Sequence, residues 1–224
     1  MGRIFNMDNK FFTFMSRVAD LIILNVVFIV CCIPIVTIGA SVTAMNYVTM
    51  KMARNEESYI VKSFFKSFRE NFKQATIIWL ILLVAGLLLG MDFRIVQQVE
   101  STGLLKVVTY GLYMVALIYA MVLSYIFPLL AKFDNTIKNT FKNAMLMSIR
   151  HLPFTIVILL VGFAPAIATL TIPIVLAYGL IVWIMVGFSL IAFLNSLMFV
   201  RIFDHYIPQE EDSLMEGSSD SSEH

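Results

Sequence analysis

The sequence predicts an all-α fold, a polytopic membrane bundle of about six transmembrane helices, with five helices as the alternative. Composition is the first reason, because 59% of the 224 residues are hydrophobic and only 14% are charged. Soluble domains are about 45–50% apolar and about 25% charged. Spacing is the second reason: no charged residue occurs in residues 77–91, 107–131, 152–170 or 172–200. Since a bilayer core requires about 17–25 apolar residues per helix, each stretch is long enough to span it or nearly so.

The distribution of basic residues predicts an orientation. With six spans, 14 of the 16 Lys and Arg residues lie on one side, and only Arg94 and Lys106 lie on the other. Basic residues concentrate in cytoplasmic loops. We therefore expect a cell-membrane protein with both termini and both basic segments, residues 51–73 and 132–150, in the cytoplasm. Five spans would divide the same charges eleven to five, so the rule favours six.

The first apolar stretch, residues 18–50, is long for one span and short for two at about 1.5 Å per residue. Pro34 and Gly39 bracket a break in it. We expect a short hairpin, with helices over 18–33 and 38–52. One kinked span followed by an interfacial helix is an alternative, and a cleaved signal peptide is a third.

The remaining apolar stretches pair into two more hairpins. Residues 76–91 pair with 104–130, and residues 152–170 pair with 172–203, each through a short outer connection. The plan is therefore three hairpins that form a single transmembrane domain over residues 1–207.

The last segment, residues 208–224, has a different composition from the rest of the chain. It contains six acidic residues and no Lys or Arg, and without it the formal charge rises from +1 to +7. Segments rich in Ser, Gly and acidic residues are typical of a solvated, disordered end. We expect an acidic tail of this kind.

Both inner basic segments have amphipathic character. Phenylalanines recur at helical spacing over residues 64–72, with Lys and Arg between them. We expect this helix to lie among cytoplasmic headgroups, where each basic residue gains about 1 kcal/mol from anionic lipid. Docking of a cytoplasmic partner is the alternative. The candidate lipid- or partner-contact residues are Lys62, Phe65, Lys66, Arg69, Lys73, Lys138, Lys142 and Arg150.

Polar residues inside the apolar stretches are candidates for a cavity. Such side chains commonly form hydrogen bonds between membrane helices, each worth about 0.6–2 kcal/mol, and helix packing is the leading interpretation. A site for a polar ligand is the second. The candidate cavity residues are Thr37, Ser41, Thr43, Asn46 and Asn195.

Motifs for a chemical step are absent from the sequence. It contains no Gly-rich phosphate loop, no paired-histidine metal motif and no Gly-x-Ser-x-Gly turn. The central apolar stretches contain no carboxylate or histidine for proton coupling. We therefore expect a protein that is not an enzyme, with no cofactor, no metal and no nucleic-acid partner.

Several segments, taken in order, resemble the YesL family, which comprises small integral membrane proteins of Gram-positive bacteria with a domain of unknown function. The resemblance rests on residues 35–41, 54–57, 64–73, 127–135, 139–153 and 192–196. It implies a context, because family members tend to be encoded beside ABC importers of sugars and polysaccharide-degrading enzymes.

This context suggests an accessory or scaffolding subunit that associates with the permease or ATPase subunits of a carbohydrate ABC importer. Residues 135–150, a short basic segment between spans, are placed as the coupling helix of an ABC permease would be, a comparison of architecture alone. One alternative is an autonomous permease for a small polar solute or sugar, with the polar side of residues 38–52 lining its path. Another is a lipid-organising structural protein that acts through residues 64–73.

Overall fold

The structure, a computed structural model, describes residues 2–56, 59–98 and 103–206. The regular elements formed by these residues are all helices, with no strand among them, which confirms the all-α prediction. The predicted acidic tail, residues 208–224, lies outside the described residues. The elements are α1 (Gly2–Cys32), a 3-10 turn (Ile35–Thr37), α2 (Ile38–Ala53), α3 (Ile60–Gln98), α4 (Gly103–Lys132), α5 (Ile137–Arg150), α6 (Leu152–Thr171), α7 (Pro173–Val182), a π turn (Trp183–Gly187) and α8 (Phe188–Asp204).

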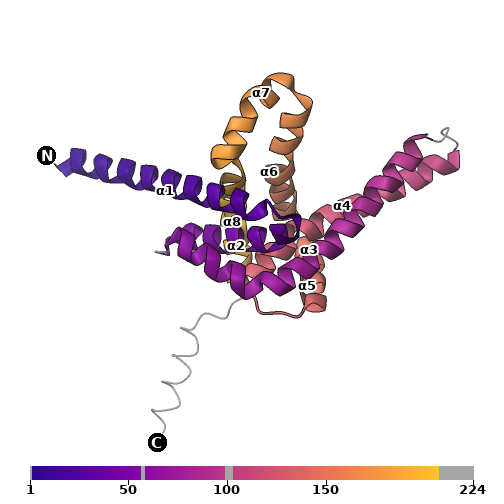
Figure 1. Cartoon of the computed structure of the whole chain (residues 1–224), viewed down its shortest axis with the longest axis horizontal. Helices are drawn as coiled ribbons and strands as arrows, with labels where there is room; N and C mark the ends of the chain where they lie inside the picture. The colour runs from indigo at the N-terminus through magenta and orange to yellow at the C-terminus, as the bar shows by residue number, and fades with distance from the viewer. Residues whose placement is uncertain (1, 57–58, 99–102, 207–224) are drawn as a thin grey trace, which may run out of the picture.

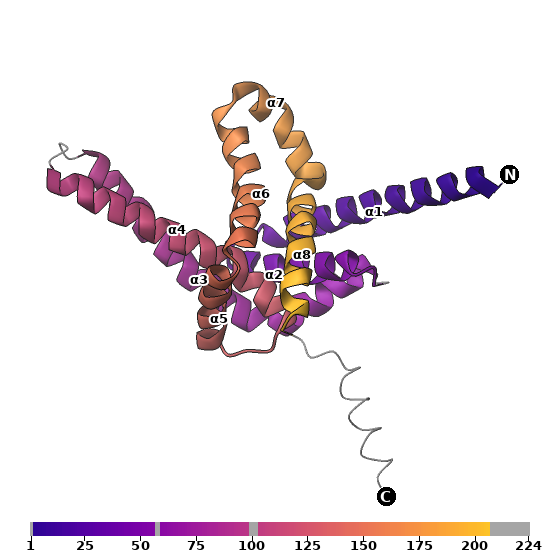
Figure 2. The ribbon, with the colours of Figure 1, turned by 180° about the vertical axis from the view of Figure 1, so that it is seen from behind.

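Three arms diverge from a common centre (Figures 1 and 2). The first arm is α1, the second is the α3–α4 hairpin, and the third is formed by α6 with α7 and α8. Helix α2 lies at the centre, where it packs against α3, α8 and α4. Helix α5 lies at the end of the molecule opposite the tip of α7 (Figure 1). The two predicted hairpins after residue 76 are therefore present.

Five segments are long and apolar enough to cross a membrane, which is the number in the alternative prediction. They are Phe12–Cys32, Ile60–Gln98, Leu105–Lys132, Leu152–Thr171 and Pro173–Asp204. The expected sixth span, α2, has only 16 residues, of which 11 are buried. At about 1.5 Å per residue it is about 24 Å long, shorter than a bilayer core of about 30 Å. Helix α2 is therefore a buried central helix rather than a full-length span.

Helices α1 and α2 nevertheless form the expected hairpin. The Arg17 guanidinium donates a hydrogen bond to the side-chain oxygen of Asn55, just after α2, so α2 returns to the level of Arg17. The neighbouring Arg54 forms an ion pair with Asp204 at the end of α8. Residues near both ends of the described chain therefore meet at one end of the centre.

Pro34 and Gly39, the two residues that bracket the predicted break, shape the turn of this hairpin. Pro34 has no backbone N–H to continue α1, which ends at Cys32. Gly39 lets α2 approach α3 closely, because a Cβ atom there would lie 2.5 Å from the Ala75 carbonyl oxygen and 2.6 Å from Trp79 Cβ. Small residues at helix contacts allow such close packing in membranes.

Buried hydrogen bonds connect the arms at the centre. Asn25 on α1 is fully buried and donates to the carbonyl oxygens of Trp183 (3.0 Å) and Ile184 (2.7 Å) in the π turn. It accepts a hydrogen bond from the backbone N–H of Ser189 (3.0 Å). A π turn interrupts regular α-helical hydrogen bonding, and Asn25 supplies donors to its carbonyl groups. The arm formed by α1 is thereby fixed to α8.

Two further buried contacts join other helix pairs. The hydroxyl groups of Thr49 and Ser196 lie 2.7 Å apart and connect α2 to α8. The hydroxyl groups of Tyr125 and Thr155 lie 2.8 Å apart and connect α4 to α6. Polar side chains inside the bundle therefore connect its helices, as the packing interpretation expected.

Candidate functional site

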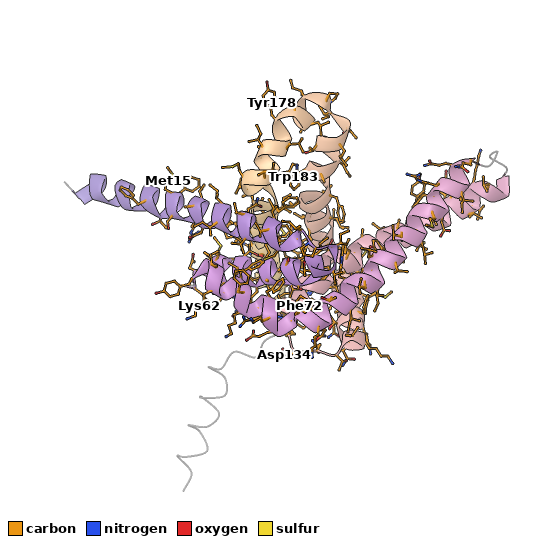
Figure 3. The ribbon with its side chains drawn as sticks, in the orientation of Figure 1. Met15, Lys62, Phe72, Asp134, Tyr178 and Trp183 are labelled. Carbon is orange, nitrogen blue, oxygen red and sulfur yellow. The ribbon has the colours of Figure 1, made fainter. Side chains whose placement is uncertain are left out.

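The basic segments gather at one end of the molecule. Figure 3 shows Lys62, Phe72 and Asp134 at the end opposite Tyr178, which lies near the tip of α7. We call this end, formed by the first half of α3 and by α5, the basic face. The two basic segments of the sequence therefore lie at the same end of the folded molecule.

The first half of α3 presents aromatic and basic side chains together. Phe64 is fully buried, which sets the side of the helix that faces the centre, and its ring stacks on that of Phe68 one turn later, with ring centroids 6.1 Å apart. Phe65 and Phe72 on the outer side are exposed by 45% and 36%. The basic residues of this surface are also exposed: Lys62, Lys66, Arg69 and Lys73. Aromatic rings beside basic groups are typical of a helix at a membrane surface.

Helix α5 is short and amphipathic, yet part of its exposed surface is apolar. The Thr136 hydroxyl caps its N-terminus by accepting a hydrogen bond from the Asn139 N–H (3.4 Å). Its buried residues are Thr140, Ala144, Met147 and Ser148. Its exposed residues include the candidate contact residues Lys138, Lys142 and Arg150, together with Met145, Leu146 and Ile149. Large apolar side chains grouped on a surface indicate a contact site.

A groove of about 300 Å³ runs beside α5, between α4 and the end of α8. We call it the α5 groove. Its floor is largely apolar and Arg150 lies at its edge, 5.6 Å from the centroid of the Tyr206 ring. The groove is lined by Leu129, Phe133, Asn135, Asn143, Leu146, Met147, Arg150 and Tyr206.

His151 joins α5 to α6 and fixes Tyr206. Its Nε2 atom lies 2.9 Å from the Tyr206 hydroxyl oxygen. Partial burial lowers the pKa of His151 below its usual value, and the positive charge of Arg150 and the neighbouring His205 lower it further. This end of the groove therefore favours the neutral imidazole.

The candidate cavity residues near α2 form hydrogen bonds with nearby backbone. The side chains of Ser41, Thr43 and Asn46 donate to carbonyl oxygens four residues earlier, at 3.0, 2.9 and 2.8 Å. Thr37 donates to the carbonyl oxygens of Cys31 and Pro34. Each of these four side chains therefore donates a hydrogen bond within the α1–α2 hairpin, and a ligand cavity at these residues stays a prediction.

Asn195, the fifth candidate cavity residue, lies on α8 and faces α6. Its Nδ2 atom is 3.8 Å from the place where a Cβ atom would stand at Gly162. The Oδ1 atom of Asn195 and the Oγ1 atom of Thr76 are buried without a hydrogen-bond partner among the described residues. These two polar atoms, on α3 and α8, are the candidates that the described residues offer for contact with a polar ligand.

Two features of this end were not predicted from the sequence: the place of Tyr206 in the groove and the ion pair between Arg54 and Asp204. The partners of these contacts lie 55 and 150 residues away along the chain. The spacing of residues within a segment does not predict contacts between residues so far apart in the sequence. An aromatic residue directly after the last apolar stretch was the one available signal for Tyr206.

Comparison with known proteins finds relatives of unknown function. The family described as "Protein of unknown function, DUF624" matches residues 21–93, from α1 through most of α3. The uncharacterized protein YesL of Bacillus subtilis (strain 168) is 29% identical over 131 residues, which are 58% of this chain and 61% of YesL. No solved structure matches the chain. The two matches confirm the resemblance to the YesL family seen in the motifs.

Proposed function

We propose that this YesL-like membrane protein is a non-enzymatic accessory or scaffolding subunit that associates with a carbohydrate ABC importer. In this proposal it lies in the cell membrane, with the basic face and both termini in the cytoplasm, because α2, although too short for a full span, returns the chain to the level of Arg17. The partners are the permease or ATPase subunits of the importer, and the bilayer surrounds the arms.

The exposure of α5 is the observation that carries this proposal. The helix connects two long apolar helices, α4 and α6, and lies at the basic face with Lys138, Lys142 and Leu146 exposed. A short helix between two spans is also the element by which ABC permeases contact their ATPase subunits, and the analogy is one of architecture. Basic and apolar groups together suit a protein partner, because exposed apolar groups supply contact area and charges supply orientation.

Affinity purification tests the proposal. The full-length chain is isolated from native membranes in a mild detergent, and the proteins that remain bound are identified by mass spectrometry. We expect permease or ATPase subunits of an ABC importer to copurify. The variant Lys138→Glu/Lys142→Glu reverses the charge of α5 and is expected to lose the ATPase subunit.

The matched control is Lys62→Glu/Lys66→Glu, which makes the same charge change on α3. We expect it to retain the partner. A preparation free of importer subunits would contradict the proposal, as would equal partner loss in both variants.

A second candidate function, an autonomous permease for a small polar solute or sugar, is supported by Thr76 Oγ1 and Asn195 Oδ1, which are buried without a hydrogen-bond partner in the described part of the chain. Buried polar atoms are normally hydrogen-bonded, and a polar solute that passes between the helices would supply the partners that these two atoms lack. Uptake of candidate sugars into vesicles that contain the purified chain tests this function. An Asn195→Leu chain that transports as well as the unchanged one would exclude this site from the path.

A further inference from the structure

The α5 groove presents an apolar floor and a basic edge, and the chain itself contains a segment of complementary chemistry. We propose that the acidic segment over residues 208–216 binds the α5 groove of the same chain. In this arrangement Leu214 and Met215 cover the apolar floor, and carboxylates contact Lys138, Lys142 and Arg150.

The groove is the right kind of surface for such a segment. Leu129 and Met147 are buried in its floor, and Leu146 at its wall is 58% exposed. An exposed leucine beside an apolar groove loses its contact with water when a second apolar group covers it, which favours binding. The apolar residues Leu214 and Met215 are the side chains that the acidic segment offers for this role.

The path of the chain brings this segment to the groove. Tyr206, the last described residue, is itself a lining residue of the groove. The hydrogen bond between the His151 ring and the Tyr206 hydroxyl, and the guanidinium of Arg150 over the Tyr206 ring, fix Tyr206 at this place. Eight extended residues reach up to about 26 Å, whereas α5 with its 14 residues is about 21 Å long. Leu214 can therefore reach any point of α5.

The charges of the two partners are complementary. Residues 208–216 contain Glu210, Glu211, Asp212 and Glu216 and no basic residue. Helix α5 contains Lys138, Lys142 and Arg150 and no acidic residue. The ion pairs between described residues, Lys51 with Glu56 and Arg54 with Asp204, involve none of these three cations. Tethering beside the groove raises the effective concentration of the acidic segment to the millimolar range.

The basic half of α3 suits this segment less well. Its Lys62, Lys66 and Arg69 line a surface hollow together with an acidic residue, Glu70, and its exposed apolar groups include phenylalanines that suit a lipid surface. The tail-binding inference stands without the proposed function. Only its consequence rests on that function: a tail bound on α5 would compete with an ATPase subunit for the same helix.

Zero-length crosslinking tests the inference on the purified full-length chain in lipid nanodiscs. A carbodiimide joins carboxylates to lysines that touch them, and peptide mass spectrometry identifies the pairs. We expect links from Glu210, Glu211 or Asp212 to Lys138 or Lys142 to exceed links to Lys62 or Lys66 by at least about fivefold. A mixture of isotope-labelled and unlabelled chains separates links within one chain from links between chains.

Two variants on α5 separate groove binding from charge attraction alone. Leu146→Ser alters the wall of the groove, and we expect it to reduce the links at least about fivefold, the factor for 1 kcal/mol. Ile149→Ser is the matched control, because Ile149 is also exposed on α5 but does not line the groove. Equal linking to α3 and α5, links between chains only, or no effect of Leu146→Ser would each overturn the inference. Copurification of importer subunits is a separate measurement, so failure of one proposal is distinguishable from failure of the other.

Discussion

The centre of the molecule and its arms have the same apolar character, but they differ in how their helices are held. At the centre, α2 buries most of its residues between α3, α4 and α8. In the arms, large apolar side chains are mostly exposed, among them Leu88 on α3, Met114 on α4 and Leu160 on α6. Lipid chains solvate such side chains as well as protein does, so apolar character alone does not draw membrane helices together.

Small residues and buried hydrogen bonds hold the helices together at the centre. Gly39 permits contact with α3, and Asn25 and Thr49 bond to α8 or to the turn before it. In the arms, a Cβ atom added at Gly90 or Gly111 would meet no described atom within 4 Å. The comparison indicates that particular contacts at the centre hold its helices together, whereas arm positions such as Gly90 and Gly111 tolerate substitution.

The largest effect is expected from Gly39→Leu. The new side chain would collide with the Ala75 carbonyl group and with Trp79, so we expect the free energy of unfolding to fall by about 3 kcal/mol. Unfolding by denaturing detergent, followed by circular dichroism, measures the change. Gly90→Leu makes the same substitution in an arm and should leave stability unchanged or slightly higher, because Leu favours helix over Gly by up to about 1 kcal/mol. Equal losses in both variants would remove the distinction between centre and arm.

Asn25→Leu is expected to have the next largest effect. The substitution removes the amide group that donates to two carbonyl oxygens of the π turn and accepts from the Ser189 N–H. Since these groups are buried, we expect the free energy of unfolding to fall by about 2 kcal/mol. The same unfolding measurement applies, with Asn195→Leu as the control. Since Asn195 Oδ1 has no partner among the described residues, its replacement should cost less than about 0.5 kcal/mol. A larger loss at Asn195 than at Asn25 would show that the π turn is not held as the structure indicates.

A smaller effect is expected from Thr49→Val, which removes the hydroxyl bonded to Ser196 between α2 and α8. Bonds of this kind between membrane helices contribute about 0.6–1.7 kcal/mol, and we expect a loss in that range. Thr109→Val in the α4 arm is the control, because the Thr109 hydroxyl bonds only within its own helix, to the Leu105 carbonyl oxygen. Thermal unfolding in detergent should separate the two variants by several degrees.

The smallest effect concerns pH and the basic face. Because the folded state lowers the pKa of His151, the unfolded state binds a proton more readily as the pH falls through the usual histidine pKa of about 6.5. The contribution of neutral His151 to stability is therefore present above this pH and is lost below it. Thermal unfolding at about pH 5.5 and 7.5 measures the difference, which His151→Gln should reduce. An unchanged pH dependence in His151→Gln would assign the effect to other groups.

Much of the architecture was determined by the sequence itself. The apolar stretches, the break at Pro34 and the pairing of the later hairpins follow from local composition, and each is present in the structure. The concentration of Lys and Arg in two segments likewise predicted a basic face, because charge excludes those segments from the bilayer wherever the helices pack. The eight candidate contact residues lie on this face, and their function stays a prediction.

Only the tertiary structure decided which contacts hold the helices and what kind of element α2 is. Residues 38–52 are apolar enough to suggest a span, but α2 is short and enclosed by α3, α4 and α8. The bonds of Asn25 to the π turn, the ion pair of Arg54 with Asp204 and the place of Tyr206 in the α5 groove join residues far apart in the chain. Hydropathy and charge are properties of each segment by itself and fix its depth in the membrane. Which faces meet depends on shape and hydrogen-bond geometry between segments, and these exist only once the chain has folded.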